Sequence, residues 1–406
     1  MENNKTPSIR FKGFTDPWEQ RKLGEVCSEI GDGLHSAPTY DDNGEYYFVN
    51  GNNLVNGHIE IDEVETKRVS SSTFTSNDKG LDENTILLSI NGTIGNLAYY
   101  AGEKVMLGKS AAYLKVKDIK KEFLYTSLQT EMILNKFMLS LTGTTIKNLG
   151  LEAIKKTSIS IPGYDEQTKV GKYFNNLDNL ITLHQRKYNK LLNVKKSMLE
   201  KMFPKNGSNI PKIRFKGFTD PWEQRKFNEL VIIERGGSPR PIDKFITNDA
   251  NGLNWVKIGD APQQGNYITK TAEKIIPEGL SKTREVHPGD LILSNSMSFG
   301  KPYIMAINGC IHDGWLLIRD TNKVFDLKFL CQMLGTEQML SQYKALAAGS
   351  TVNNLNKELV GNTNVTVPNI KEQQQIGEYF SSLDNLITLH QRLYFWCELR
   401  LIIRFL

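Results

Sequence analysis

The stretch Ile9–Lys22, IRFKGFTDPWEQRK, occurs twice, because the same fourteen residues return unchanged at Ile213–Lys226, 204 positions later. A second identity, LDNLITLHQR, relates Leu177–Arg186 to Leu383–Arg392 at an offset of 206. Solenoid repeats have periods of about 20 to 50 residues, so a period of this length indicates whole domains. The sequence therefore predicts two similar domain-sized units.

Between these identical stretches the two halves diverge. A shorter similarity remains, since GTTIKNL at Gly143–Leu149 corresponds to GSTVNNL at Gly349–Leu355. The repeated stretches form a framework around a divergent central segment in each half, called its body. A similar framework around dissimilar bodies suggests one scaffold that presents two different recognition surfaces.

Composition is that of a globular protein of two domains. The chain has 406 residues, 39% hydrophobic and 23% charged, with a net charge of +5. No apolar run approaches the roughly 18 residues that a membrane span needs, and the N-terminus lacks the apolar core of a secretory signal. We therefore expect a cytoplasmic protein that does not enter a membrane. Its four cysteines are widely spaced, which argues against a zinc site or a disulfide framework and favours reduced, mostly buried thiols.

Each half has segments rich in β-branched and aromatic residues between Gly and Asn, which predicts short strands. In the first half these are YYFVNGNNL, HIEIDEV, ENTILLSI, NLAYYAG and AAYLKVKD, and in the second NWVKIGD, GDLILSN, KPYIMAI and DGWLLIRD. We expect one helix from Phe123 to about Leu139, one from about Lys328 to Ala347, and a short helix after Asp16-Pro17. The predicted fold class is α+β, with two similar mixed α/β domains.

A long helix is predicted from Glu166 to about Phe203, with a matching helix at the end of the second half. Apolar residues recur in both at heptad spacing, which predicts a coiled coil in which the two helices pack on one another. The residues expected to pack between the helices are Phe174, Leu177, Ile181, His184, Tyr188 and Leu191 in the first and Phe380, Leu383, Ile387, His390 and Tyr394 in the second. Lys195 interrupts the apolar stripe, and His184 with His390 is expected to form a hydrogen-bonded pair rather than a metal site.

The first long helix is also basic. Between Glu166 and Lys205 there are nine Lys or Arg residues against three acids. This excess fits either a solvated helix face or a face directed at phosphates.

Catalytic motifs are missing from the sequence. The segment Gly102–Ser110, GEKVMLGKS, has one residue too many between its glycines for a P-loop, and no G-x-G-x-x-G follows a strand. There is no Asp-Pro-Pro-Tyr or Asn-Pro-Pro-Tyr tetrapeptide of an amino-methyltransferase, no convincing nuclease arrangement, and no H-x-x-x-H or H-E-x-x-H spacing. What remains is binding: Gly31–Tyr40 and Glu234–Lys244 are Gly-rich loops whose polar side chains are suited either to DNA or to an ordinary surface.

The whole pattern resembles the specificity (S) subunit of type I restriction-modification systems. The similarity rests on four features: the duplicated openings FKGFTDPWEQRKLGE and FKGFTDPWEQRKFNE, the GTTIKNL and GSTVNNL turns, the helices PGYDEQTKVGKYFNNLDNLITLHQRK and PNIKEQQQIGEYFSSLDNLITLHQR, and the segment HPGDLILSNSMSFGK. It covers nearly the whole chain in the order body, helix, body, helix. The family implies a first recognition domain at 1–164, a central helix at 165–204, a linker at 205–212, a second recognition domain at 213–370 and a final helix at 371–406.

The resemblance implies a DNA-binding subunit that is not itself an enzyme. Each domain would recognise one half of a gapped double-stranded DNA target, and the two long helices would lie antiparallel, set the spacer and bind two modification subunits. S-adenosylmethionine, ATP and Mg²⁺ would be bound by the modification and restriction subunits, with no cofactor or metal in this chain. The alternatives are a coiled-coil scaffold that does not bind DNA and an unrecognised nuclease or methyltransferase.

Residues for DNA contact are chosen by their place in loops and at strand ends. In the first half they are His35, Ser36, Asn52, Asn53, Asn91, Lys109 and Lys147. In the second they are Arg235, Ser238, Arg240, Lys244, Lys257, Lys282, Arg284, Asn295, Lys301 and Asn353.

The last residues depart from the family pattern. After Arg392 the chain continues LYFWCELRLIIRFL, where the first helix has KYNKLLNVKKSMLEKMFP. Apolar residues would spread around this helix and leave exposed apolar surface. We interpret the segment as a shifted reading frame or a truncated ending that would impair binding of a modification subunit.

Overall fold

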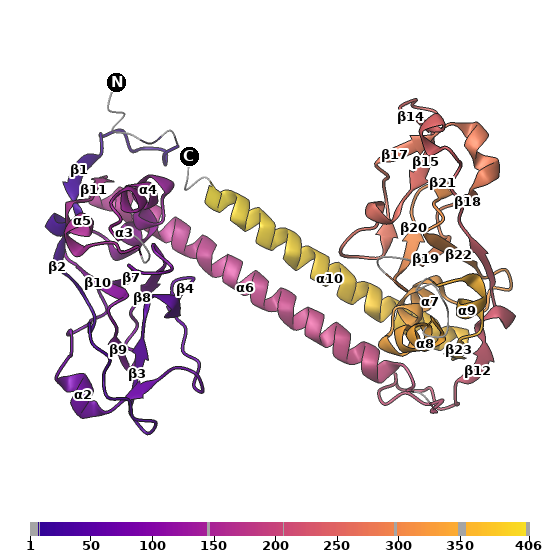
Figure 1. Ribbon diagram of the computed structural model, residues 1–406, viewed down its shortest axis with the longest axis horizontal. Helices are drawn as coiled ribbons and strands as arrows, with labels where there is room; N and C mark the ends of the chain where they lie inside the picture. The colour runs from indigo at the N-terminus through magenta and orange to yellow at the C-terminus, as the bar shows by residue number, and fades with distance from the viewer. Residues whose placement is uncertain are drawn as a thin grey trace. The chain divides into compact units, whose positions relative to one another are not determined.

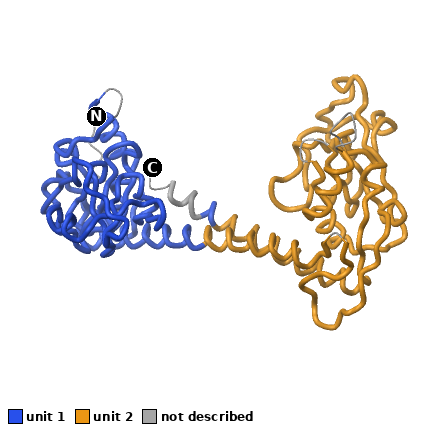
Figure 2. Tube along the Cα trace, turned by 60° about the horizontal axis from the view of Figure 1, so that its bottom comes forward, with its two compact units in different colours: residues 1–183, 394–406 blue, residues 184–393 orange. Residues whose placement is uncertain are grey.

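A computed structural model describes most of the chain. The described residues are 7, 9–143, 147–205, 207–295, 299–347 and 355–402, with side chains as far as Trp396. The chain divides into two units, residues 1–183 with 394–406 and residues 184–393, called units 1 and 2 and coloured separately in Figure 2. The α+β class, with two mixed domains and two long helices, is confirmed (Figure 1).

Unit 1 is built from short elements and the first part of a long helix. Its strands are β1 (Glu19–Lys22), β2 (Cys27–Asp32), β3 (Tyr46–Val49), β4 (Leu54–Val55), β5 (His58–Ile59), β6 (Arg68–Val69), β7 (Thr85–Ser89), β8 (Leu97–Tyr99), β9 (Val105–Leu107), β10 (Ala111–Val116) and β11 (Ser158–Ile161). Its helices are α1 (Leu23–Val26), α2 (Ser71–Thr75), α3 (Lys121–Leu128), α4 (Glu131–Leu139) and α5 (Leu151–Lys156), followed by the long helix α6 (Tyr164–Met202), which continues into unit 2.

Unit 2 repeats this plan with additional strands. Its strands are β12 (Glu223–Lys226), β13 (Ile232–Arg235), β14 (Ile246–Thr247), β15 (Leu253–Val256), β16 (Tyr267–Ile268), β17 (Glu273–Ile275), β18 (Arg284–Val286), β19 (Leu291–Ser294), β20 (Pro302–Met305), β21 (Gly309–Ile311), β22 (Trp315–Arg319) and β23 (Asn364–Val367). Its helices are α7 (Leu327–Leu334), α8 (Glu337–Ala347), α9 (Lys357–Gly361) and the long helix α10 (Ile370–Ile402), whose last residues are grouped with unit 1.

The central sheet of unit 1, in the order β2-β10-β7-β8, is apolar on both faces. Successive side chains of a strand point to opposite faces, so Ile86 and Leu88 join one buried cluster with α3 and α4, while Leu87 joins another with β3 and β9. A sheet covered on both faces has continuous apolar strands, which explains the run ILLSI.

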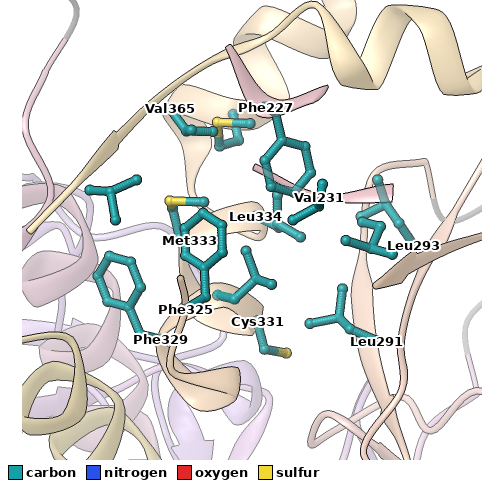
Figure 3. Close-up of a cluster of buried hydrophobic side chains, with 14 of the residues drawn as sticks. Phe227, Val231, Leu291, Leu293, Phe325, Phe329, Cys331, Met333, Leu334 and Val365 are labelled. Carbon is teal, nitrogen blue, oxygen red and sulfur yellow. The ribbon is translucent and has the colours of Figure 1, made fainter. Parts of the chain in front are cut away.

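Unit 2 has the same arrangement around its sheet β13-β22-β19-β20-β16. Leu291 and Leu293 enter the large cluster beside α7, whereas Ile292 packs with Val256 and Ile311 of the second sheet, β14-β17-β15-β21-β18. Figure 3 shows part of the large cluster, in which Phe325 lies between Phe329 and the sheet residues Leu291 and Leu293.

The duplicated block forms an anchor between the start of each unit and its long helix. In unit 1, β1 pairs with β11, which directly precedes α6, and in unit 2, β12 pairs in the same way with β23. The short helix predicted after Asp16-Pro17 is therefore wrong over Glu19–Lys22, where pairing with β11 imposes a strand. A short helix, α1, begins only at Leu23.

Side chains of the block complete each anchor. Phe11 packs edge-on against Tyr173 of α6, and Trp18 packs against Phe123 of α3, with ring centroids 5.8 Å apart in both pairs. The equivalent pair in unit 2 is Trp222 with Phe329, also at 5.8 Å. The aromatic residues of the block are thus packing residues.

Two helices predicted as continuous are each broken in two. The helix expected at Phe123–Leu139 is α3 and α4, separated at Gln129-Thr130, where the Thr130 hydroxyl donates to the Ser127 carbonyl. The helix expected at Lys328–Ala347 is α7 and α8, separated at Gly335-Thr336, where the Thr336 hydroxyl donates to the Met333 carbonyl. A hydroxyl that binds the last carbonyls competes with continued helix, which ends the first segment of each pair.

The long helices contact one another within unit 2. His184 Nδ1 of α6 lies 2.9 Å from His390 Nδ1 of α10, and Lys195 Nζ donates to Asp384 Oδ1 at 2.6 Å. The residue numbers of α10 fall along these contacts as those of α6 rise, so these parts of the two helices are antiparallel, as Figure 1 shows. Asp384 accounts for the lysine that interrupts the apolar stripe.

The other predicted packing residues occupy varied surroundings. Leu191 packs against the cluster that contains Phe380 and Leu383, and Ile387 is buried. The Tyr188 hydroxyl accepts a hydrogen bond from Gln264 of the loop before β16. On the unit 1 part of α6, Leu177 is buried, while Phe174 and Ile181 are half-buried, as is Tyr394 of α10. Beyond Arg392, Phe395 and Trp396 expose about half of their surface, 52% and 49%.

Candidate nucleic-acid interface

Five loop segments of unit 1 are joined side by side at the ends of its strands. They are residues 33–36, 50–53, 90–96, 108–110 and 147–149, called the first loop edge. Backbone hydrogen bonds of 2.8 to 3.2 Å connect them: Gly33 to Ala111, Leu34 to Leu107, Gly108 to Val49, Ile90 to Ser110 and Leu149 to Ile90. All seven residues predicted for DNA contact in the first half lie in this edge.

Unit 2 builds the same edge from residues of largely different sequence. The second loop edge consists of residues 235–240, 256–257, 295, 312–314 and 355. Its five corresponding bonds join Gly236 to Trp315, Gly237 to Ile311, His312 to Val256, Asn295 to Gly314 and Leu355 to Asn295, at 2.9 to 3.2 Å. The two edges are therefore equivalent position by position.

Glycine is required in each unit where the Gly-rich loop passes over the backbone at the end of β9 or β21. A Cβ atom on Gly33 would lie 2.1 Å from the Leu107 carbonyl oxygen, and one on Gly236 would lie 2.2 Å from that of His312. Only glycine permits this approach, because any side chain would overlap the backbone. The Gly-rich character of both loops thus has a structural cause, and their neighbouring polar residues are presented outward.

The predicted residues of the first edge differ in what they already bind. His35 is 74% exposed and its Nε2 lies 2.8 Å from Asp32 Oδ2. Ser36, Asn52, Lys109 and Lys147 are exposed. These side chains are accessible to a ligand.

Two asparagines of the first edge are engaged in its construction. Asn53 accepts from the Asn50 backbone and donates to the Glu60 carbonyl. Asn91 is half-buried, bridges to Asn148, and has a buried side-chain oxygen that accepts no hydrogen bond from the described residues. The side-chain amide of Asn53 is therefore used to hold the loop together.

The predicted residues of unit 2 are mostly cations. Arg240 is 74% exposed, Lys244 is exposed, and Lys282 lies over the Phe245 ring at 4.8 Å. Lys257 and Arg284 form ion pairs with Glu273 and Glu234. Lys301 donates to the Gln263 carbonyl at 3.2 Å. Asn353 lies outside the described residues.

Asn295 is not on the surface. It is 3% exposed, and its amide donates to the Asp313 carbonyl at 2.8 Å. Its place is beneath the turn that joins β21 to β22, where it supports the edge. Direct contact with a base would need this amide to leave its present partner.

Asp313 was missed by sequence reasoning, although it contacts four of the predicted residues. Its side chain accepts from Ser238 at 3.0 Å and lies 3.8 Å from Arg240 Nη2. Its carbonyl accepts from Asn295 and from Arg235 Nε, the latter at 3.3 Å. Alignment of the two halves at an offset of 204 pairs Asp313 with Lys109, which was predicted, so that signal was available.

The second edge has a positive electrostatic environment. The pKa of His312 is held below its ordinary value, first by burial and then by the charges of Arg240, Lys257 and Arg235, against the opposing effect of Asp313. His312 Nδ1 accepts the Gly314 backbone N–H at 2.9 Å and lies 2.9 Å from Asp313 Oδ1. The arrangement is suited to an anionic ligand with hydrogen-bond acceptors, such as duplex DNA.

In the described part of the chain, the buried cysteines and the metal-ligating side chains bear on two kinds of reactive site, an activated thiol and a metal centre. Cys27, Cys310 and Cys331 are buried, and burial raises their pKa values to about 12, 11 and 12, which disfavours the reactive thiolate. No group of three or more His, Cys, Asp or Glu side chains among the described residues is placed to hold a metal ion. Over the same residues, no helix is long and apolar enough to cross a membrane.

Comparison with known proteins agrees with this geometry. A family model described as the type I restriction modification DNA specificity domain matches residues 15–193 and again 219–394, so the chain belongs to that family. The type I restriction enzyme MjaVIII specificity subunit of Methanocaldococcus jannaschii is 24% identical over 390 residues, which are 93% of this chain and 88% of that protein.

Solved structures share the fold. The type I restriction-modification S subunit from M. genitalium superposes with a TM-score of 0.59 at 15% identity, over 99% of both chains. A chain from a structure of type I R-M complex assembly and conformational transition superposes with a TM-score of 0.50 at 17% identity, over 96% of both chains.

Proposed function

We propose that this chain gives a type I restriction-modification complex its DNA sequence specificity, and that each loop edge recognises one half of a gapped double-stranded target. The observation that carries the proposal is the pair of edges. Five backbone hydrogen bonds are the same in both, while the side chains that they present differ. Equivalent surfaces with different side chains are suited to two half-sites of different sequence.

Exposed leucines that are repeated in the two long helices indicate where partner subunits bind. Leu180 and Leu183 of α6 are 41% and 46% exposed, and their counterparts Leu386 and Leu389 of α10 are 44% and 49% exposed. Packing in the core does not explain why the same two leucines are exposed in both long helices. We infer that each set binds one modification subunit, giving two in the complex, and that the long helices also set the spacer between half-sites.

Chemistry belongs to the partners in this proposal. The chain itself is not an enzyme and binds no cofactor or metal. S-adenosylmethionine, ATP and Mg²⁺ are bound by the modification and restriction subunits, in the cytoplasm. Its role is to deliver those subunits to a defined sequence.

A methylation map tests the proposal. The chain is produced with its modification subunit in cells that lack adenine methylation, and modified adenines are located by sequencing. A two-part gapped motif is expected. If the complex forms and methylates DNA without a gapped motif, the proposal is wrong.

A further inference from the structure

Asp313 places a negative charge among cations that are proposed to meet DNA. It lies in the turn between β21 and β22, and its side chain is 33% exposed. A carboxylate at such a place repels phosphates and lowers affinity for DNA of any sequence. Its presence therefore needs a reason other than attraction.

The fold itself does not require an acid at this position. The corresponding turn in unit 1 contains Lys109, which is exposed, and the strand that leads into the loop ends there in Asp32 instead of Arg235. In unit 1 the acidic residue precedes the loop and the basic residue lies in the turn, whereas in unit 2 the basic residue precedes the loop and the acidic residue lies in the turn. The acid in the turn is a property of the second edge alone.

The contacts of Asp313 show what it does. Oδ1 accepts the Ser238 hydroxyl at 3.0 Å and lies 2.9 Å from His312 Nδ1, and Oδ2 lies 3.8 Å from Arg240 Nη2. One carboxylate thus contacts two residues of the opposite loop and the neighbouring residue of its own turn. Arg240 remains 74% exposed. A guanidinium has five N–H donors in a planar fork, so this single contact leaves donors for a ligand.

We propose that Asp313 is a positioning residue that holds Ser238 and Arg240 in one orientation, and that it thereby sets the base sequence recognised by unit 2. The recognised group is a base edge with two neighbouring acceptors, the pattern of guanine O6 and N7 that arginine binds in a bidentate manner. This inference rests on the proposed function.

The test compares two variants with the same change of charge. Asp313→Ala removes the contacts of the carboxylate, whereas Asp243→Ala removes an exposed acid of the opposite loop, Glu234–Lys244. Each chain is produced with its modification subunit, and methylation maps are recorded together with affinities for oligonucleotides changed at single base pairs. Lys109→Ala in unit 1 identifies which half-site belongs to which unit.

With Asp313→Ala we expect discrimination at one position of one half-site to fall about tenfold, within the range of a lost bidentate contact, while affinity for unrelated DNA is equal or higher. The other half-site stays unchanged, which shows that the chain is folded. Ser238→Ala should relax the same position. Asp243→Ala should keep the full motif.

Two results would overturn the inference. If both aspartate variants behave alike, Asp313 acts through charge alone. If the Asp313→Ala and Ser238→Ala complexes keep the wild-type motif and discrimination, the contacts do not position Arg240. The proposed function fails separately, when the unaltered complex itself methylates without a gapped motif.

Discussion

Arg214 binds both carboxylate oxygens of Glu372 at 2.7 Å, and Arg10 binds Glu166 in the same way at the same distances. Each arginine also donates to a backbone carbonyl of its own block, that of Asp220 or Asp16. The glutamate lies in the first turn of the long helix, so the pair ties the duplicated block to the helix that follows each body. Bidentate pairing of this kind fixes orientation as well as distance.

Loss of Arg214 should therefore destabilise unit 2. Glu372 is fully buried, and Arg214→Ala leaves its charge without a partner, which costs about 3 kcal/mol of unfolding free energy. Arg214→Lys should also destabilise, because an ammonium does not bind both oxygens in a planar fork. Urea unfolding followed by tryptophan fluorescence measures the effect. Arg225→Ala, at an exposed ion pair, is the control and should change little.

Gly377 allows α10 to approach α7 closely. A Cβ atom there would lie 2.5 Å from Asp326 Oδ1 and 2.9 Å from the Phe329 nitrogen. Alanine normally favours a helix over glycine by about 1 kcal/mol, but here the overlap should dominate and destabilise by about 1 to 3 kcal/mol. The thermal midpoint should fall. Gly163→Ala, whose added methyl meets nothing within 4 Å, should not lower it.

The histidine pair between α6 and α10 should make their contact sensitive to acid. Burial, then His184 and Lys187, lower the pKa of His390 from 6.5. The unfolded chain then binds a proton at a higher pH than the folded chain, so stability present above pH 6.5 is lost as the pH falls through the folded pKa. The drop in thermal midpoint from pH 7.5 to 5.5 should be smaller in His390→Asn. An unchanged drop would refute this, and exposed His58→Asn is the control.

Arg240→Ala tests direct recognition at the second loop edge. If Arg240 binds a base, the variant should lose about 1 to 3 kcal/mol of affinity for the cognate site and relax one position of one half-site. Lys344→Ala, at an exposed position of α8, makes the same charge change away from the edge. Equal losses in both variants would show that Arg240 contributes only net charge. Competition binding at fixed salt separates the outcomes.

Repetition and periodicity were the strongest signals of the fold. Identity between the halves predicted two similar units, and the heptads predicted both long helices. Where tertiary pairing decides the backbone, local sequence was misleading: Glu19–Lys22 is a strand only because β11 lies beside it. The breaks at Thr130 and Thr336 depend on single hydroxyl contacts that periodicity does not register.

The loop edges were predictable in place but not in detail. Position after a strand brought all seven chosen residues of unit 1 to the first loop edge, but only five of the ten of unit 2 to the second. Burial of Asn295 and the contacts of Asp313 come from the crossing of distant segments, which sequence spacing does not give. The candidates for DNA contact were chosen for positive charge or hydrogen-bonding side chains, so an acidic residue such as Asp313 was passed over.

The pairing of β1 with β11, and of β12 with β23, brings the entrance and exit of each body to adjacent strands. Whatever lies between them begins and ends at the same place, and the long helix starts from that place through the arginine–glutamate pair. A body of another sequence and length can therefore be exchanged between two fixed ends without altering the helix. Target preference and assembly are then free to change independently, because mutations that alter one are confined to residues that do not support the other.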